Sequence, residues 1–185
     1  MKTASVSAEA FLRKHWITGV VLLVLALNAL WMIRLAVSVP SSSEESNAPP
    51  FELPRLGPAG QLGAKMSLRS LRGKVVLLDF WASWCGPCTE TLPELARLDR
   101  QRRSEGVQVV GILTNDEDLR GAARMARALG VGYPILVDDG VVSNGYRADQ
   151  LPKLAVVGRD GILRSNEAGA HSLLELDRLV APWID

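Results

Sequence analysis

The sequence predicts an α/β domain with a mostly parallel central sheet and helices on both faces, after residue 50 of the 185-residue chain. Three observations support this prediction. Segments of strand and helix character alternate along this part of the chain. Two of the strand segments are continuous apolar runs, which are typical of strands buried on both faces. A late hairpin follows the alternation, and this order favours a central sheet between helices.

The predicted strands begin with GKVVLLDF (73–80) and VQVVGIL (107–113), the two continuous apolar runs. YPILVDD (133–139) is a shorter third strand. In KLAVVGRDGILRS (153–165), two strands flank the turn GRDG, whose Gly and Asp residues are typical of a β-hairpin.

Three segments have helical patterns. Residues 88–101 place leucines at helical spacing, and residues 116–130 end at a glycine, where a helix C-terminus is expected. The closing segment 172–180 begins with Ser172 and Glu175 at the spacing of a capping box, which marks a helix N-terminus.

The N-terminal part predicts a membrane anchor. Residues 16–33 contain no charged side chain over 18 positions, and the apolar helix can extend to residue 39 if Arg34 reaches the headgroups. Basic residues are more numerous before this segment than after it, so the positive-inside rule places the N-terminus in the cytoplasm. The predicted organisation is a cytoplasmic N-terminus (1–15), a transmembrane anchor (16–39), a flexible Ser- and Pro-rich linker (40–50) and the α/β domain (51–185).

A cleaved signal peptide is the alternative interpretation, because residues 36–38 (AVS) resemble a cleavage site. The apolar run is longer than the core of an ordinary signal peptide, which favours an uncleaved anchor. Both interpretations export the rest of the chain. The net charge of +1 gives no indication of a nucleic-acid partner.

The two cysteines of the chain, Cys85 and Cys88, form a C-x-x-C pair between a buried strand and a helix. Near a helix N-terminus, free N–H groups and the helix dipole stabilise a thiolate, so Cys85 is a candidate nucleophile and Cys88 can resolve a mixed disulfide. A zinc site would need a second ligand pair, and the two histidines lack metal-like spacing. A structural disulfide over three residues would stabilise little. We therefore predict redox chemistry, with no metal and no cofactor beyond the disulfide.

The motif FWASWCGPC resembles the active site of the thioredoxin superfamily. The flanking stretches FELPRL, MSLRSLRGKVVLLDF and LPKLAVVGRDGIL resemble its membrane-anchored branch, the TlpA/ResA/CcmG-like thiol–disulfide oxidoreductases. Peroxiredoxins share a sequence like LRGK before the first core strand, but their reactive cysteine does not lie in a W-C-G-P-C motif. The resemblance covers about residues 51–185 and implies a thioredoxin-like fold, a central mixed sheet flanked by helices, with an N-terminal β-hairpin.

The resemblance also implies roles for individual residues. Cys85 would attack and Cys88 would resolve, with Trp84 shielding the pair. Pro152 matches a proline that follows a cis peptide bond beside the disulfide. The backbone of Leu151 would then hydrogen-bond an incoming substrate chain as an added strand.

Asp79, six residues before Cys85, matches a buried acid of thioredoxins, and an apolar strand should raise the pKa of its carboxyl group. It is our candidate for exchanging a proton with Cys88. The TlpA-like branch more often has Asn here and commonly has Glu six residues after the first cysteine. This chain has Thr91 at that place, with Glu90 beside it, so Asp79 is the better candidate acid.

The expected function is therefore that of an extracytoplasmic, single-pass thiol–disulfide oxidoreductase of the inner membrane, which reduces disulfides in exported proteins. The family implies a membrane electron donor of the cytochrome-biogenesis transporter type, and substrates in cytochrome c or copper-site assembly. Two alternatives remain open: a disulfide oxidase or isomerase with the same site, and a non-enzymatic copper-carrying or assembly module.

Overall fold

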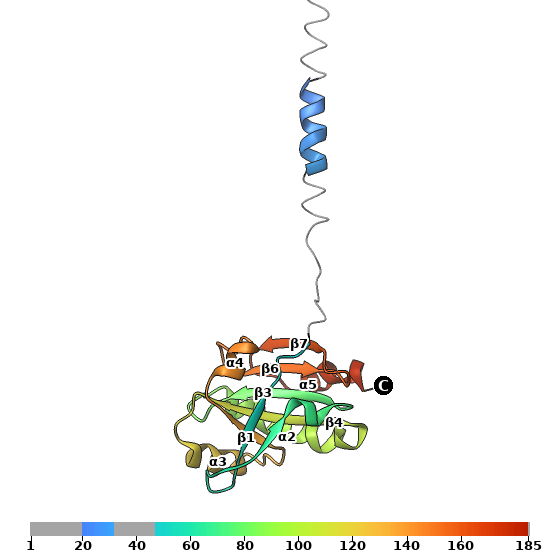
Figure 1. Ribbon diagram of the computed structural model, residues 1–185. Helices are drawn as coiled ribbons and strands as arrows, with labels where there is room; N and C mark the ends of the chain where they lie inside the picture. Colours follow the sequence, from blue (N-terminus) through green and yellow to red (C-terminus); the bar gives the residue numbers. More distant parts are fainter. Residues whose placement is uncertain (1–19, 32–46, 185) are drawn as a thin grey trace, which may run out of the picture. The chain divides into compact units, whose positions relative to one another are not determined.

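The computed structural model describes residues 20–31 and 47–184 (Figure 1). The chain divides into two compact units, Met1–Ser43 and Glu44–Asp185. In the first, residues 20–31 are helical, and their side chains are exposed. Within the two described ranges, no helix has the length and apolar character needed to cross a membrane. The predicted anchor, residues 16–39, extends beyond the described residues at both ends.

The second unit is built on a seven-stranded sheet with the order β2-β1-β5-β4-β3-β6-β7 (Figure 1). The predicted strands are all present, and β3 and β4 lie in the middle of the sheet. The strand bounds are β1 Glu52–Leu56, β2 Leu62–Ser67, β3 Val75–Trp81, β4 Val107–Thr114, β5 Ile135–Asp138, β6 Lys153–Val157 and β7 Leu163–Ala168.

The sheet is mixed, as the family resemblance implied. Strand β4 pairs in parallel with β3 and with β5, while the four other pairings, β1 with β2 and β5, and β6 with β3 and β7, are antiparallel. The prediction of a mostly parallel sheet is therefore wrong for the sheet as a whole. The reason is that the hairpins β1–β2 and β6–β7 flank the three parallel strands, and each hairpin joins them through an antiparallel pairing.

Helices lie on both faces, as predicted. Leucines and alanines of α2, α3 and α5 pack on one face of the sheet, together with both cysteines. The short helices η1 and α4 and the segment around Phe51 cover the other face. The helix bounds are η1 Leu68–Leu71, α2 Cys88–Arg102, η2 Arg103–Glu105, α3 Leu119–Ala128, α4 Val141–Gly145, α5 Leu173–Val180 and η3 Ala181–Trp183.

Capping residues and a glycine explain where two of these helices begin or end. Helix α5 begins after Ser172, and its capping box with Glu175 is present. Gly130, just beyond α3, has a φ of +75°, a conformation that glycine adopts without steric cost. The sequence analysis did not predict η1 or α4.

The ordered domain begins before the predicted boundary at residue 51. Ala48 is buried, and its N–H donates to the Gly161 carbonyl at 3.0 Å. The hydroxyl of Tyr146 donates to the Pro49 carbonyl at 2.9 Å. Residues 47–50, which we assigned to the linker, therefore lie against the domain.

Candidate active site

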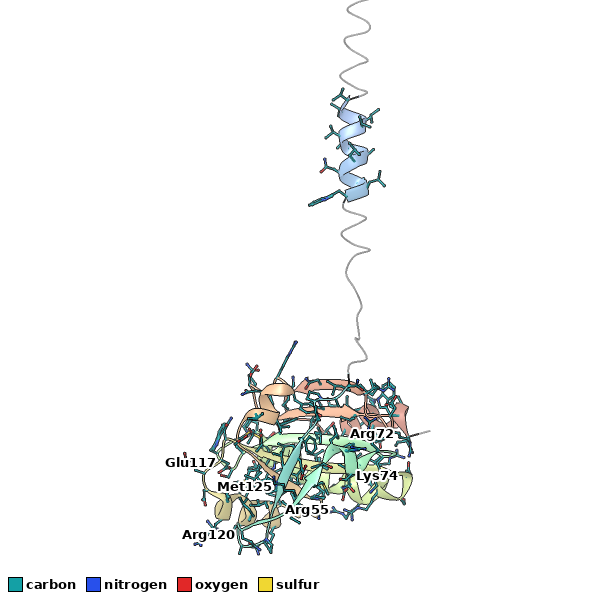
Figure 2. The ribbon with its side chains drawn as sticks, in the orientation of Figure 1. Arg55, Arg72, Lys74, Glu117, Arg120 and Met125 are labelled. Atoms are coloured by element: carbon teal, nitrogen blue, oxygen red, sulfur yellow. A yellow bond between two sulfur atoms is a disulfide. The ribbon has the colours of Figure 1, made fainter. Side chains whose placement is uncertain are left out.

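The candidate site lies at the edge of the sheet where the parallel strands end. Strand β3 ends at Trp81, and a short turn leads from it to the cysteines and into α2. In Figure 2, Glu117, in the loop after β4, marks this edge, and Arg72 and Lys74, just before β3, mark the opposite one.

The two cysteines form a disulfide, with 5.4 Å between their Cα atoms. Helix α2 begins at Cys88, whose N–H donates to the Cys85 carbonyl at 3.2 Å, so Cys85 lies one turn before the helix. Cys85 is 5% exposed and Cys88 is 1% exposed. The disulfide is therefore almost fully covered, with slightly more of Cys85 than of Cys88 at the surface.

The loop after β4 holds the residues that precede Cys85. The Nε1 of Trp84 donates to the Asn115 carbonyl at 3.0 Å, and the Ser83 N–H donates to the Asp116 carboxylate. Trp84 is nevertheless 64% exposed. Its indole is fixed beside the disulfide while most of its apolar surface stays accessible to another molecule.

The segment before β6 reaches the same edge. The Leu151–Pro152 peptide bond is cis, and Pro152 is buried. Strand β6 runs antiparallel to β3 with Lys153 opposite Phe80, so Leu151 and Pro152 lie at the end of β3 that leads to Cys85. No described residue hydrogen-bonds to the backbone of Leu151, which is half-buried.

Asp79 lies in the middle of β3, with Leu77 and Trp81 on the same face of the sheet as the two cysteines. It is 1% exposed, and neither carboxylate oxygen has a hydrogen-bond partner among the described residues. Burial raises the pKa of Asp79 from 3.8 to about 8. A carboxyl group with a pKa this close to neutral pH can gain or lose its proton there, as a group that exchanges protons with a thiol requires.

Thr91 and Glu90 are neighbours in α2 but lie in different environments. Thr91 is buried in α2, and its hydroxyl has no partner among the described residues, whereas Glu90 is exposed. The position where family members commonly carry an acid therefore faces the interior. Asp79 is a buried carboxyl group on the face of the sheet that carries the cysteines.

The sequence analysis missed two polar groups on this face, the indole N–H of Trp81 and the hydroxyl of Tyr133. Both are buried without a hydrogen-bond partner among the described residues. The predicted strand 133–139 included Tyr133 without giving it a role, and Trp81 follows the predicted strand 73–80. Only the tertiary structure shows that both groups are buried on this face. Across residues 20–31 and 47–184, no group of three or more His, Cys, Asp or Glu side chains could hold a metal ion.

Comparison with known proteins gives one family. Residues 45–166 match the model of the AhpC/TSA family. The chain is 26% identical over 168 residues to the thioredoxin-like protein YneN of Bacillus subtilis, covering 89% of this chain and 96% of that protein. It is 30% identical over 146 residues to the thiol-disulfide oxidoreductase ResA of the same organism, covering 78% of each chain.

Solved structures agree with this relationship. A secreted disulfide oxidoreductase of Mycobacterium tuberculosis, homologous to DsbE of Escherichia coli, matches at 27% identity with a TM-score of 0.62, over 76% of this chain and 99% of that one. A Chlorobium tepidum protein, described as a candidate thiol:disulfide interchange protein DsbE, matches with a TM-score of 0.68 over 76% of this chain and 96% of that one. Its identity of 24% supports the fold alone.

Proposed function

The chain belongs to the AhpC/TSA family of thioredoxin-like proteins and is a thiol–disulfide oxidoreductase, and from that premise we propose that it reduces disulfides in exported proteins. The observation that carries the proposal is the Cys85–Cys88 disulfide at the start of α2, on the same face of the sheet as a buried carboxyl group without a hydrogen-bond partner among the described residues. Such a carboxyl group can exchange a proton with a buried thiol.

The proposed reaction starts from the dithiol form. The Cys85 thiolate attacks a substrate disulfide, forms a mixed disulfide and releases the first substrate thiolate, which takes a proton from solvent. The Cys88 thiol then gives its proton to the Asp79 carboxylate, and its thiolate attacks the Cys85 sulfur. This step closes the Cys85–Cys88 disulfide and releases the second substrate thiolate. Cys85 is assigned the attack because it matches the attacking cysteine of the family and is the more exposed of the two residues, at 5% against 1%.

Substrate would be held by the groups that surround Cys85. The exposed face of Trp84 offers an apolar contact, and the unused backbone groups of Leu151 allow a substrate chain to pair as a short strand. Main-chain pairing is tolerant of sequence, which suits an enzyme that acts on several proteins. Specificity would then come from the side chains around this edge.

We place the reaction outside the cytoplasm, with residues 16–39 as a single-pass anchor in the lipid bilayer of the inner membrane. The support is the charge-free run of residues 16–33 and the excess of basic residues before it. The family resemblance adds a membrane electron donor of the cytochrome-biogenesis transporter type, and substrates from cytochrome c or copper-site assembly.

The site is tested by trapping the mixed disulfide. Reduced Cys88→Ser protein, mixed with a peptide that contains one disulfide, should accumulate a Cys85–peptide adduct, because the resolving thiol is missing. The matched Cys85→Ser variant should form much less adduct, since Cys88 is the more buried residue. Mass spectrometry of the quenched samples distinguishes the two variants. Equal adduct formation by both would contradict the assignment of roles.

The direction is tested by equilibrium with glutathione. A reductase should have a potential nearer the value of about −270 mV for thioredoxin than the value of about −120 mV for the oxidant DsbA. A value close to that of DsbA would favour the oxidase alternative. Full activity of Cys88→Ser in cells would favour a non-enzymatic role instead.

The location is tested with the full-length chain and a chain that begins at residue 44. The full-length protein should sediment with membranes, and protease added outside the inner membrane should digest its C-terminal domain. The shorter chain should not sediment. A protected C-terminal domain would reverse the proposed orientation.

A further inference from the structure

A hollow of about 450 Å³ lies at the edge of the sheet opposite the cysteines. Its wall includes Gln108, the second residue of β4, and Ile135, the first residue of β5. Because β3, β4 and β5 run in parallel and Cys85 follows the end of β3, the hollow lies where these strands begin. Gln108 and Thr114, at the two ends of β4, are about 20 Å apart along the strand. The hollow is therefore separate from the catalytic edge.

Three arginines line this hollow, and each comes from a different element of the fold. Arg55 is in β1, Arg103 follows α2 at the start of η2, and Arg127 is in the last turn of α3. None of the fourteen described residues in its wall is acidic. The wall is therefore positively charged, and we call this site the arginine hollow.

Two of the three arginines have no counter-charge within the described part of the chain. The guanidinium of Arg103 pairs with the Asp99 carboxylate. The guanidinium groups of Arg55 and Arg127 make neither an ion pair nor a hydrogen bond with a described residue. The last turn of a helix favours a basic residue, which explains Arg127 but not Arg55. Like charges around one hollow repel one another, and an anion between them would relieve this repulsion.

The catalytic edge has the opposite charge. A second hollow lies beside the loop whose Asn115 carbonyl accepts a hydrogen bond from Trp84. Its charged residues are Glu52, Lys65, Asp116, Glu117, Asp138 and Asp139. Five of these six are acidic, so an anion would be repelled from the catalytic edge and attracted to the arginine hollow.

The rest of the arginine hollow indicates the kind of anion. Most of its other lining residues are apolar, and they include Leu56, Ala123, Ala126, Val131, Pro134 and Ile135. Sites for small molecules have such volumes and such walls, with a few polar groups that fix the orientation of the ligand. A planar carboxylate matches the fork of one guanidinium, whereas a phosphate monoester has three terminal oxygens and up to two charges. Three guanidinium groups therefore favour the phosphate, and the apolar wall favours an attached organic group.

We propose that the arginine hollow binds a small phosphate monoester with an apolar organic group. The phosphate oxygens accept hydrogen bonds from the guanidinium groups of Arg55, Arg103 and Arg127. Arg103 keeps its contact with Asp99, because a guanidinium has five N–H donors. The organic group packs against the start of β5 and the loop before it. This inference goes beyond the proposed function and does not rest on it, since neither cysteine takes part in the binding.

The test is calorimetric titration of the full-length protein, in a neutral detergent, with phenyl phosphate. This probe has one phosphate monoester and one apolar ring. Arg55→Gln and Arg127→Gln should each raise the Kd at least about tenfold, because each removes a charge-assisted hydrogen bond to the ligand. Both side chains are exposed and make no contact to lose with a described partner, so both variants should fold, which circular dichroism checks.

The matched control is Arg124→Gln. Arg124 is also an exposed arginine of α3, but it does not line the hollow. This variant removes the same charge and should keep the Kd of the wild type. Equal weakening in all three variants would show a diffuse effect of charge and would overturn the inference. No binding by the wild type would also overturn it, but would leave the proposed function intact.

Three further probes test the class of ligand. Inorganic phosphate lacks the apolar group, and benzoate has the ring with one planar carboxylate. Each should bind at least about tenfold more weakly than phenyl phosphate, and equal binding of either would overturn the assignment to an organic phosphate. Dihexanoyl phosphatidic acid has the same phosphate group on a short-chain lipid. Tighter binding of this lipid than of phenyl phosphate would identify a lipid headgroup as the source, and weaker binding a soluble ester.

Discussion

Asp79 and Asp138 are both buried at the sheet, with exposures of 1% and 3%, but their surroundings differ completely. Asp138, at the end of β5, accepts hydrogen bonds from the N–H groups of Val142 and Ser143 at 3.0 and 2.9 Å. The hydroxyl of Thr114 lies 3.3 Å from the same carboxylate. Asp79 has no such partner among the described residues.

The difference follows from position along the strand. A strand end is followed by a turn whose N–H groups are free, so the Asp138 carboxylate pairs with the first residues of α4. Asp79 lies between two neighbouring strands that use the backbone N–H groups around it. A carboxyl group in mid-strand thus costs free energy that one at the strand end avoids. The comparison indicates that Asp138 stabilises the fold and that Asp79 is suited to proton transfer.

The largest effect is expected from Asp79→Asn. Between the unfolded pKa of 3.8 and the folded pKa of about 8, the unfolded state releases a proton that the folded state retains. The stability that Asp79 contributes is therefore complete below pH 4 and is lost as pH rises through 8. Since asparagine does not titrate, the variant should be more stable at pH 7, by as much as about 4 kcal/mol.

Urea unfolding of the oxidised proteins at pH 4 and pH 7 measures this difference, which should disappear at the lower pH. The same variant should resolve mixed disulfides about tenfold more slowly at pH 7, because the proton acceptor of Cys88 is gone. A variant that is less stable than the wild type at pH 7 would place Asp79 in the same class as Asp138.

Asp138→Asn should have the opposite effect on stability. An amide oxygen cannot accept all the hydrogen bonds of the carboxylate, and the Asn NH₂ group would face buried donors. We expect a loss of about 2–3 kcal/mol in the free energy of unfolding, with unchanged exchange kinetics in the folded protein. The exposed neighbour Asp139 gives the control, since Asp139→Asn should change stability by less than about 0.5 kcal/mol. Slower exchange in Asp138→Asn would contradict the separation of the two roles.

The smallest effect is expected from Thr91→Val. The two side chains have nearly the same shape, and the buried Thr91 hydroxyl has no described partner to lose. The variant should be as stable as the wild type or slightly more so, within about 1 kcal/mol, with unchanged exchange rates. A marked fall in rate would show that the hydroxyl replaces the acid that relatives commonly carry at this position.

Local patterns predicted most of the fold. The apolar runs of β3 and β4, the late hairpin and the capping box of α5 depend on neighbouring residues, and the structure has each of them. Helix α4 has only five residues and begins after Gly140, so it lacks the periodic pattern from which a helix can be read. The antiparallel majority of the sheet was missed because strand direction depends on how distant segments pair.

For the candidate site too, some features followed from the sequence and others only from the tertiary structure. The sequence by itself determined the cysteine pair, its place between strand and helix, and the aspartate in an apolar strand, because all are carried by adjacent residues of one motif. Only the tertiary structure decided that Asp79 lacks hydrogen-bond partners among the described residues and, at the opposite edge, that Arg55, Arg103 and Arg127 line one hollow. The three arginines lie 24 to 72 positions apart in the sequence. Their arrangement depends on strand register and side-chain packing, which no local pattern of the sequence encodes.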